Sequence, residues 1–208
     1  QGSGGAAPVG TQIGSGTRLN GTTKVYTPGV LEGTDRQLDV AIDGEGFFAV
    51  TLPDSGTGYT RDGTFHVNNE GKLVTGQGYV MVPEITVPQD TLEITIDQQG
   101  RVLGRTAGSP DTAQSFGQIN ITRFVNPSGM LAVGGNVVRQ TDASGAPITS
   151  TPGNNGLGIL KQGFVERSNV VIVNELVNLI VAQRAYEVNS RAIQASDQML
   201  QTATNIVR

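Results

Sequence analysis

The chain has 208 residues and a formal net charge of −4, and only 15% of its residues are charged, while 29 are glycine. Because no basic field is available to attract phosphate groups, the composition argues against nucleic-acid binding. The chain contains no cysteine and one histidine, which excludes disulfides and thiolate metal sites, and no apolar run reaches the roughly 18 residues that predict a membrane span.

Residues 1–23 contain seven glycines and no aromatic residue, and their apolar side chains stand at isolated positions. Such a composition is typical of a flexible or extended linker rather than of a packed element. We therefore expect three parts along the chain: a glycine-rich linker at 1–23, an antiparallel β domain at 24–168, and a C-terminal helix at 169–208.

Short alternating apolar runs separated by glycine-containing turns predict the β domain. Successive strands are expected to pair with their neighbours in a meander, at 38–42, 47–50, 59–61, 64–67, 72–75 and 79–82. Further strands are expected at 92–96, 102–105, 118–124, 136–140 and 160–166, with a long loop at 141–158. The predicted fold class is mainly β with a long C-terminal α-helix, the strands forming a meander, a partly open barrel or a sandwich.

The C-terminal segment carries an apolar residue at every seventh position, which predicts one long, coiled-coil-like helix. Ser168 or Asn174 is the expected N-cap, and a rise of 1.5 Å per residue gives a rod of roughly 50 Å. Because no other part of the chain has helical periodicity, the partner of this helix must be another chain or segment. The residues expected at a subunit interface are Ile172, Leu176, Leu179, Ile180, Tyr186, Ile193, Met199, Leu200, Ile206 and Val207.

Chemical motifs are sparse. His66 alternates with Phe65 and Val67, so it is expected to face solvent or a neighbouring molecule. Asp43, Asp54 and Asp62 all lie in turns, where an aspartate side chain usually bonds the local backbone. We therefore assign no catalytic, cofactor-binding or metal-binding residue and expect no enzyme activity.

Two other functions stay open on the residues alone. One is a carbohydrate-binding or adhesin-like β module with a stalk helix. The other is a hydrolase of cell-wall polymers, which would need two carboxylates roughly 5 to 10 Å apart.

Two groups of motifs resemble the bacterial flagellar rod and hook protein family. The first is the run from Leu38 to Phe48 (LDVAIDGEGFF), followed by YTRDGTF at 59–65 and GKLVT at 71–75; the second runs from GLG at 156–158 through ELVN at 175–178 to QRAYE at 183–187. The short loops at 126–129 and 151–153 are most similar to those of distal-rod members. The signature turns of the resemblance contain Asp43, Gly44, Gly46, Arg61, Asp62 and Gly63.

The resemblance implies a structural subunit, needed for motility, of a hollow helical drive shaft that transmits torque and encloses the export channel. Its implied partners are copies of itself, other rod and hook subunits, surrounding peptidoglycan- and outer-membrane-ring proteins, and the type III flagellar export apparatus. The implied location is the flagellar basal body, across the periplasm. A proximal rod or hook protein is the alternative within the family.

The family also pairs an N-terminal helix with the C-terminal one. This sequence contains no such helix, and its glycine-rich start resembles the linker that follows it. Either the chain is a fragment or its ends pack in another way.

Overall fold

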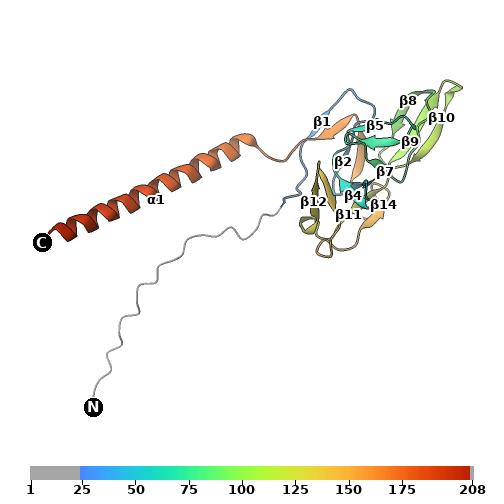
Figure 1. The fold of residues 1–208 in the computed structure, drawn as a ribbon. Helices are drawn as coiled ribbons and strands as arrows, with labels where there is room; N and C mark the ends of the chain where they lie inside the picture. The colour runs from blue at the N-terminus through green and yellow to red at the C-terminus, as the bar shows by residue number, and fades with distance from the viewer. Residues whose placement is uncertain (1–23, 207–208) are drawn as a thin grey trace, which may run out of the picture.

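A computed structural model describes residues 24–206, with side chains at 24–199 and at 201 and 202. The expected linker at 1–23 and the interface residue Val207 lie outside the described residues, as do the side chains of Leu200 and Ile206. Figure 1 shows a β domain from which a single long helix projects.

The described residues form sixteen short strands, one 3₁₀ turn (Pro127–Gly129) and one α-helix. The strands are β1 (Leu31–Gly33), β2 (Val40–Asp43), β3 (Phe47–Thr51), β4 (Thr57–Thr60), β5 (Phe65–Val67), β6 (Leu73–Thr75), β7 (Val80–Val82), β8 (Thr91–Ile96), β9 (Arg101–Thr106), β10 (Ser109–Gln118), β11 (Ile121–Arg123), β12 (Leu131–Gly134), β13 (Val137–Arg139), β14 (Ile148–Ser150), β15 (Ile159–Gln162) and β16 (Phe164–Glu166).

These strands pair in antiparallel fashion in four sheets. The largest has nine strands, ordered β12-β13-β4-β3-β7-β6-β5, with β11 and β14 joined to it through β3. Strands β10, β9 and β8 form a three-stranded sheet, and the pairs β15-β2 and β1-β16 complete the domain. The fold is therefore mainly antiparallel β with one long helix, as predicted, and its sheets do not close into a barrel.

The core lies between these sheets. Its largest cluster is centred on Phe48 and Phe65, both fully buried, whose rings meet edge-to-face with centroids 5.1 Å apart. A second cluster contains Phe47, Tyr59 and Phe124. Edge-to-face contacts of this kind add about 0.5–1.5 kcal/mol beyond the burial of area.

The expected hairpin between 38–42 and 47–50 is wrong. Strand β2 pairs with β15, in the register Ile42 to Leu160, and β3 pairs with β4, β7 and β11. The reason lies in the intervening turn, where the carbonyl groups of Ile42, Gly44 and Gly46 accept hydrogen bonds from the Arg61 side chain. The guanidinium occupies these turn carbonyls, and β2 takes β15 as its partner instead.

The expected return of 64–67 onto 59–61 is also wrong, because β5 pairs with β6 alone. Asp62 accepts hydrogen bonds from the backbone and hydroxyl of Thr64, and Gly63 accepts one from the backbone of Val40, so the chain crosses to β2 instead of doubling back. The β3-β4, β5-β6 and β6-β7 pairings are confirmed.

Four strands were not predicted: β1, β10, β12 and β14. The residues of β10 are mostly polar and exposed, so the strand lacks the alternation that marks a half-buried strand. Strand β14 lies within the stretch predicted as the loop 141–158. The strand expected at 118–124 is reduced to β11, and the one expected at 160–166 is divided into β15 and β16 by Gly163, whose φ is +74°.

The helix α1 runs over Ile172–Ile206, and its 35 residues give a length of about 52 Å. It begins after Val171, whose carbonyl accepts from the backbone N–H groups of Asn174 and Glu175. Asn174 therefore lies inside the first turn, and Ser168, which accepts a hydrogen bond from the backbone of Val170, lies before the residue that precedes the helix, so both N-cap predictions are wrong. No described strand packs extensively on α1.

Candidate functional site

The first part of the candidate site is the surface of α1, which leaves large apolar side chains in contact with water. Seven of the predicted interface residues are described, and all are exposed: Ile172 (72%), Leu176 (55%), Leu179 (61%), Ile180 (49%), Tyr186 (76%), Ile193 (64%) and Met199 (68%). Fully burying one such side chain contributes roughly 1.5–3 kcal/mol. Burying the exposed apolar side chains of α1 against other helices would therefore strongly favour association.

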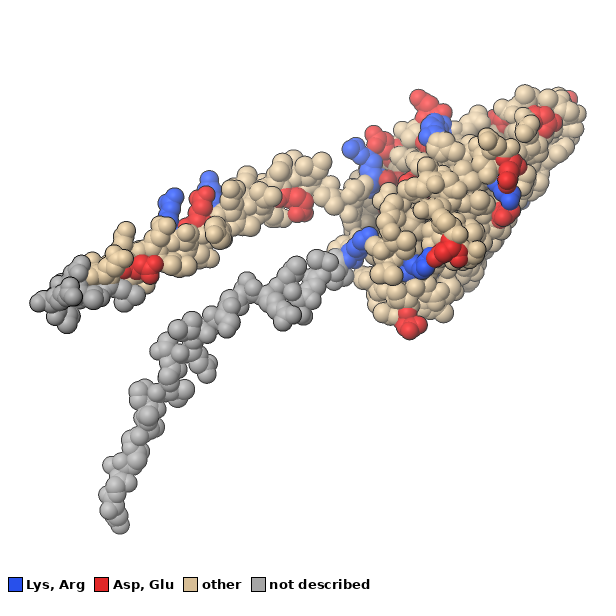
Figure 2. Space-filling model, in the orientation of Figure 1, with Lys and Arg blue, Asp and Glu red and all other residues tan. Residues whose placement is uncertain are grey.

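Charge on this helix is sparse. Glu175, Arg184, Glu187, Arg191 and Asp197 are spread along α1 without forming a block of one sign. Figure 2 shows few blue and red groups on the helix, with both signs side by side near its middle and the rest of the rod tan. Covering such a surface removes few charges from water, so the desolvation that opposes association is small.

The second part is the junction between the β domain and the helix, which is centred on Arg61. Its Nε donates to the Glu166 carboxylate at 2.7 Å, and its terminal nitrogens donate to the carbonyls of Gly44 and Gly46 at 3.0–3.2 Å. The Arg61 and Glu166 side chains are only 17% and 11% exposed. One guanidinium thus joins the β2–β3 turn to the last strand before α1.

Glu166 extends this junction to the segment that precedes β1. Its second carboxylate oxygen accepts from the backbone N–H of Gly29 at 2.7 Å. A Cβ at Gly29 would lie 1.7 Å from the carbonyl oxygen of Arg167, so only glycine allows this approach. Nearer the helix, the Asn169 side chain donates to the hydroxyl of Thr27 at 2.6 Å and to its carbonyl at 3.2 Å. The segment that precedes α1, which contains Glu166 and Asn169, is therefore hydrogen-bonded to the segment before β1 and to the β2–β3 side of the domain through Arg61.

The structure brings the predicted signature turns together around Arg61. Gly44 and Gly46 have φ values of +123° and +143°, which favour glycine. Gly63 has no room for a side chain, because a Cβ there would lie 1.7 Å from the Val40 carbonyl oxygen. Asp43 pairs with Lys161 of β15 at 2.7 Å instead of bonding its own turn.

The contacts of Glu166, Gly29 and Asn169 were missed by sequence reasoning. Glu166 and Asn169 belong to the motifs that carried the family resemblance, but nothing in their spacing identifies partners more than 100 positions away. Asn169 also follows Ser168 just before the helix, which is the nearest local signal of a junction.

The remaining polar groups have local roles. Asp54 accepts from the backbone of Gly56 and from Arg139, and the Arg139 hydrogen bond holds the pKa of the Asp54 carboxyl below its usual value. His66 is exposed beside the Arg36 side chain. Within residues 24–206, no three acidic or histidine side chains gather in a way that would hold a metal ion. Over the same residues, no helix combines the length and hydropathy needed to cross a bilayer.

A β domain that anchors the segment before a long helix, while the described residues leave that helix without a packing partner, is the arrangement expected of a subunit of a larger assembly. Comparison with known proteins specifies the assembly. The family model for the flagellar hook protein FlgE/F/G D1 domain matches residues 41–104, and the model for the flagellar basal body rod FlgEFG protein C-terminal region matches residues 161–206.

Whole-chain relatives agree with these matches. The chain is 48% identical to the flagellar basal-body rod protein FlgG of Buchnera aphidicola subsp. Schizaphis graminum, over 96% of this chain and 76% of the relative. It is 44% identical to the FlgG protein of Borreliella burgdorferi, over 97% and 76% of the two chains. For the Caulobacter vibrioides protein the identity is 41%, over 98% and 77%. The chain belongs to the FlgG family of flagellar basal-body rod proteins and is a structural component of the flagellar basal body.

Proposed function

We propose that this chain polymerises as a distal-rod subunit into a hollow helical tube that transmits torque and encloses the export channel. The observation that carries the proposal is the exposed apolar surface of α1, about 52 Å long, which has no packing partner among the described strands. In this arrangement the helices of many copies pack side by side along the inner wall, and the β domains lie outside them. A head-to-tail interface that does not close on itself builds such a filament without limit.

The Arg61–Glu166 junction supports a mechanical role. Torque applied to the β domain must pass to α1 through β16 and the short segment that follows it. Charge-assisted hydrogen bonds are the stronger class of hydrogen bond, and a guanidinium that also binds two carbonyls of the β2–β3 turn resists bending at this point. The junction would keep the angle between domain and helix the same in every copy.

The two predicted domains have different roles in this proposal. The β domain at 24–168 presents the outer surface, where ring proteins of the peptidoglycan and outer membrane would surround it in the periplasm. The helical segment at 169–208 forms the inter-subunit core, and other rod and hook subunits would continue the same packing at the two ends of the distal rod. The chain would reach this position through the flagellar export apparatus.

We propose a structural role without catalysis. The aspartates that sequence analysis weighed as hydrolytic residues are engaged elsewhere: Asp43 with Lys161, Asp54 with Arg139 and Gly56, and Asp62 with Thr64. Side chains used in this way hold turns and strand ends in place.

Substitution of the helix surface tests the proposal. Tyr186→Asp and Ile193→Asp place a charge in the predicted interface, while both positions are exposed in the single chain. We expect both variants to keep a folded β domain and to lose incorporation into rods, measured by electron microscopy of isolated basal bodies. Gln194→Asp is the matched control, because it introduces the same charge next to Ile193 at a residue that is already polar. Normal assembly of the two interface variants would contradict the proposal.

A further inference from the structure

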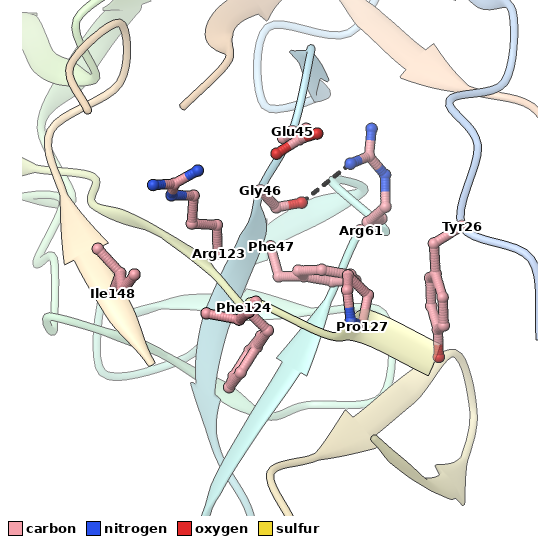
Figure 3. A pocket seen from close by; sticks show the side chains of 10 residues that line it. Tyr26, Glu45, Gly46, Phe47, Arg61, Arg123, Phe124, Pro127 and Ile148 are labelled. Carbon is pink, nitrogen blue, oxygen red and sulfur yellow. Dashed lines mark hydrogen bonds between the residues drawn. The ribbon is translucent and has the colours of Figure 1, made fainter. Parts of the chain in front are cut away.

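A cavity of about 380 Å³ lies beside the junction, between the start of β3, the end of β11 and the segment that precedes β1. Phe47 and Phe124 form its aromatic floor. Figure 3 shows Tyr26 and Arg123 on opposite sides of this floor. The rim includes Val125 and Ile148, which are 81% and 37% exposed.

Two residues that line this cavity, Tyr26 and Arg123, each have a buried polar atom without a hydrogen-bond partner within residues 24–206. The Tyr26 hydroxyl and the Arg123 Nε are both buried and find no hydrogen-bond partner among the described residues. Burial raises the pKa of Tyr26, so its hydroxyl stays protonated and remains a donor at neutral pH. A buried donor left without an acceptor costs about 1–3 kcal/mol. The Arg123 guanidinium, which lies at the cavity lining without an acceptor among the described residues, therefore favours an occupant that brings acceptor oxygens.

The other charged groups at the cavity do not supply an acceptor to Arg123. Arg61 is itself a donor, and its hydrogen bonds go to Glu166 and to the turn carbonyls. The exposed Glu45 lies near Arg123 in Figure 3 but forms no ion pair with it within 4.0 Å. Across the described part of the chain, Arg123 has neither an ion-pair partner nor a side-chain hydrogen bond. The cavity thus combines apolar walls with an uncompensated guanidinium.

We call the three-stranded sheet β8–β10 the arm. The tip of the arm carries acidic and apolar side chains, which complement the guanidinium and the apolar walls of the cavity. The tip comprises residues 90–92 and 106–111, where the backbone of Ala107 donates to the carbonyl of Asp90. Asp90, Ala107, Pro110 and Asp111 are exposed, and neither aspartate forms an ion pair with a described residue. Leu92, beside them, is 66% exposed.

The arm cannot reach the cavity of its own chain. Figure 1 shows it projecting from the side of the domain opposite α1 and away from β12. A contact between the arm of one molecule and the cavity of the next joins two different surfaces, so it propagates instead of closing into a dimer. This is the kind of contact that a helical polymer requires.

We propose that the arm tip of one copy of this chain docks in the Tyr26–Arg123 cavity of a second copy, where the Asp111 carboxylate accepts hydrogen bonds from the Arg123 guanidinium. Leu92 and Pro110 then cover the apolar rim formed by Val125 and Ile148. The inference rests on the proposed assembly into a rod and adds a second contact, between β domains, to the packing of the helices.

Disulfide trapping tests this contact, because the chain contains no native cysteine. The full-length protein carrying Val125→Cys and Ala107→Cys is assembled into rods, oxidised and analysed by denaturing electrophoresis. We expect a ladder of covalently linked copies. Val125→Cys with Thr51→Cys is the control pair, since Thr51 is exposed at the end of β3, outside the arm. It should give no ladder.

Charge reversal tests the pairing itself. In the background of the Val125→Cys and Ala107→Cys substitutions, Arg123→Glu or Asp111→Arg alone should lower the cross-linking yield at least tenfold, and the two together should restore it. Rods that form normally from the double-cysteine variant without a ladder would overturn the arm contact and leave the proposed function intact. Cross-links only to another protein would overturn it as well, because a different partner would then cover the cavity. Failure of the cysteine-free parent to form rods would overturn both proposals.

Discussion

Removing the Arg61 side chain is expected to destabilise the β domain severely. Arg61→Ala deletes the ion pair with Glu166 and leaves the carbonyls of Gly44 and Gly46 without their donor. The ion pair is shielded from water, since its two side chains are 17% and 11% exposed. Breaking a pair of this kind by removing one partner costs about 3–5 kcal/mol, because the remaining charge stays buried and uncompensated.

The exposed pair between Arg105 and Glu93 provides a matched control. Their side chains are 57% and 51% exposed at 3.4 Å, and surface pairs contribute about 0–1 kcal/mol. Arg105→Ala therefore removes the same residue type with little effect. Arg61→Lys should fall between the two variants, because a lysine keeps the charge but cannot bind the carboxylate and the turn carbonyls at once.

Urea denaturation measures this difference. The chain has no tryptophan, so tyrosine fluorescence reports on unfolding, and Tyr59 is 6% exposed within the β domain. With a denaturant slope of about 2 kcal/mol per molar, Arg61→Ala should lower the midpoint by about 2 M relative to the parent. Equal midpoints for Arg61→Ala and Arg105→Ala would refute the reasoning that the junction is a stabilising centre.

Two further predictions concern single turns. Gly63→Ala would place a methyl group 1.7 Å from the Val40 carbonyl oxygen and should lower the free energy of unfolding by about 3 kcal/mol, whereas Gly108→Ala, which enters open space, should leave it nearly unchanged in the same urea assay. Because Arg139 lowers the pKa of folded Asp54, the stability from this pair is present above the unfolded pKa near 3.8 and is lost as pH falls through the folded value. Arg139→Ala should therefore raise the pKa of Asp54 in an NMR titration, and an unchanged pKa would contradict the pairing.

Local sequence signals predicted the parts of the fold that depend on neighbouring residues. The β3-β4, β5-β6 and β6-β7 pairs were found because their turns carry glycine or aspartate between short apolar runs. The helix was found because its apolar repeat continues over five heptads, about ten helical turns. Long-range pairing explains the main errors, since β2 takes the distant strand β15 as its partner and Arg61 binds the carbonyls of the intervening turn.

The sequence likewise predicted only those parts of the candidate site that depend on neighbouring residues. Sequence motifs identified the turns around Arg61, because their glycines and aspartates follow a recognisable pattern. They did not identify Glu166 as the partner of Arg61, which lies 105 positions away in the chain. The strand β10 was missed because its exposed polar residues carry no periodicity, so of the three strands of the arm only β8 and β9 were expected.

The account depends most directly on what covers α1 in the assembled rod. A side-chain-resolution structure of the isolated rod measures this. We predict that α1 lies on the inner wall, with Tyr186 and Ile193, now 76% and 64% exposed, buried against helices of neighbouring copies. Helices that remain exposed on the outer surface of the rod, or that make no contact with other copies, would contradict the account.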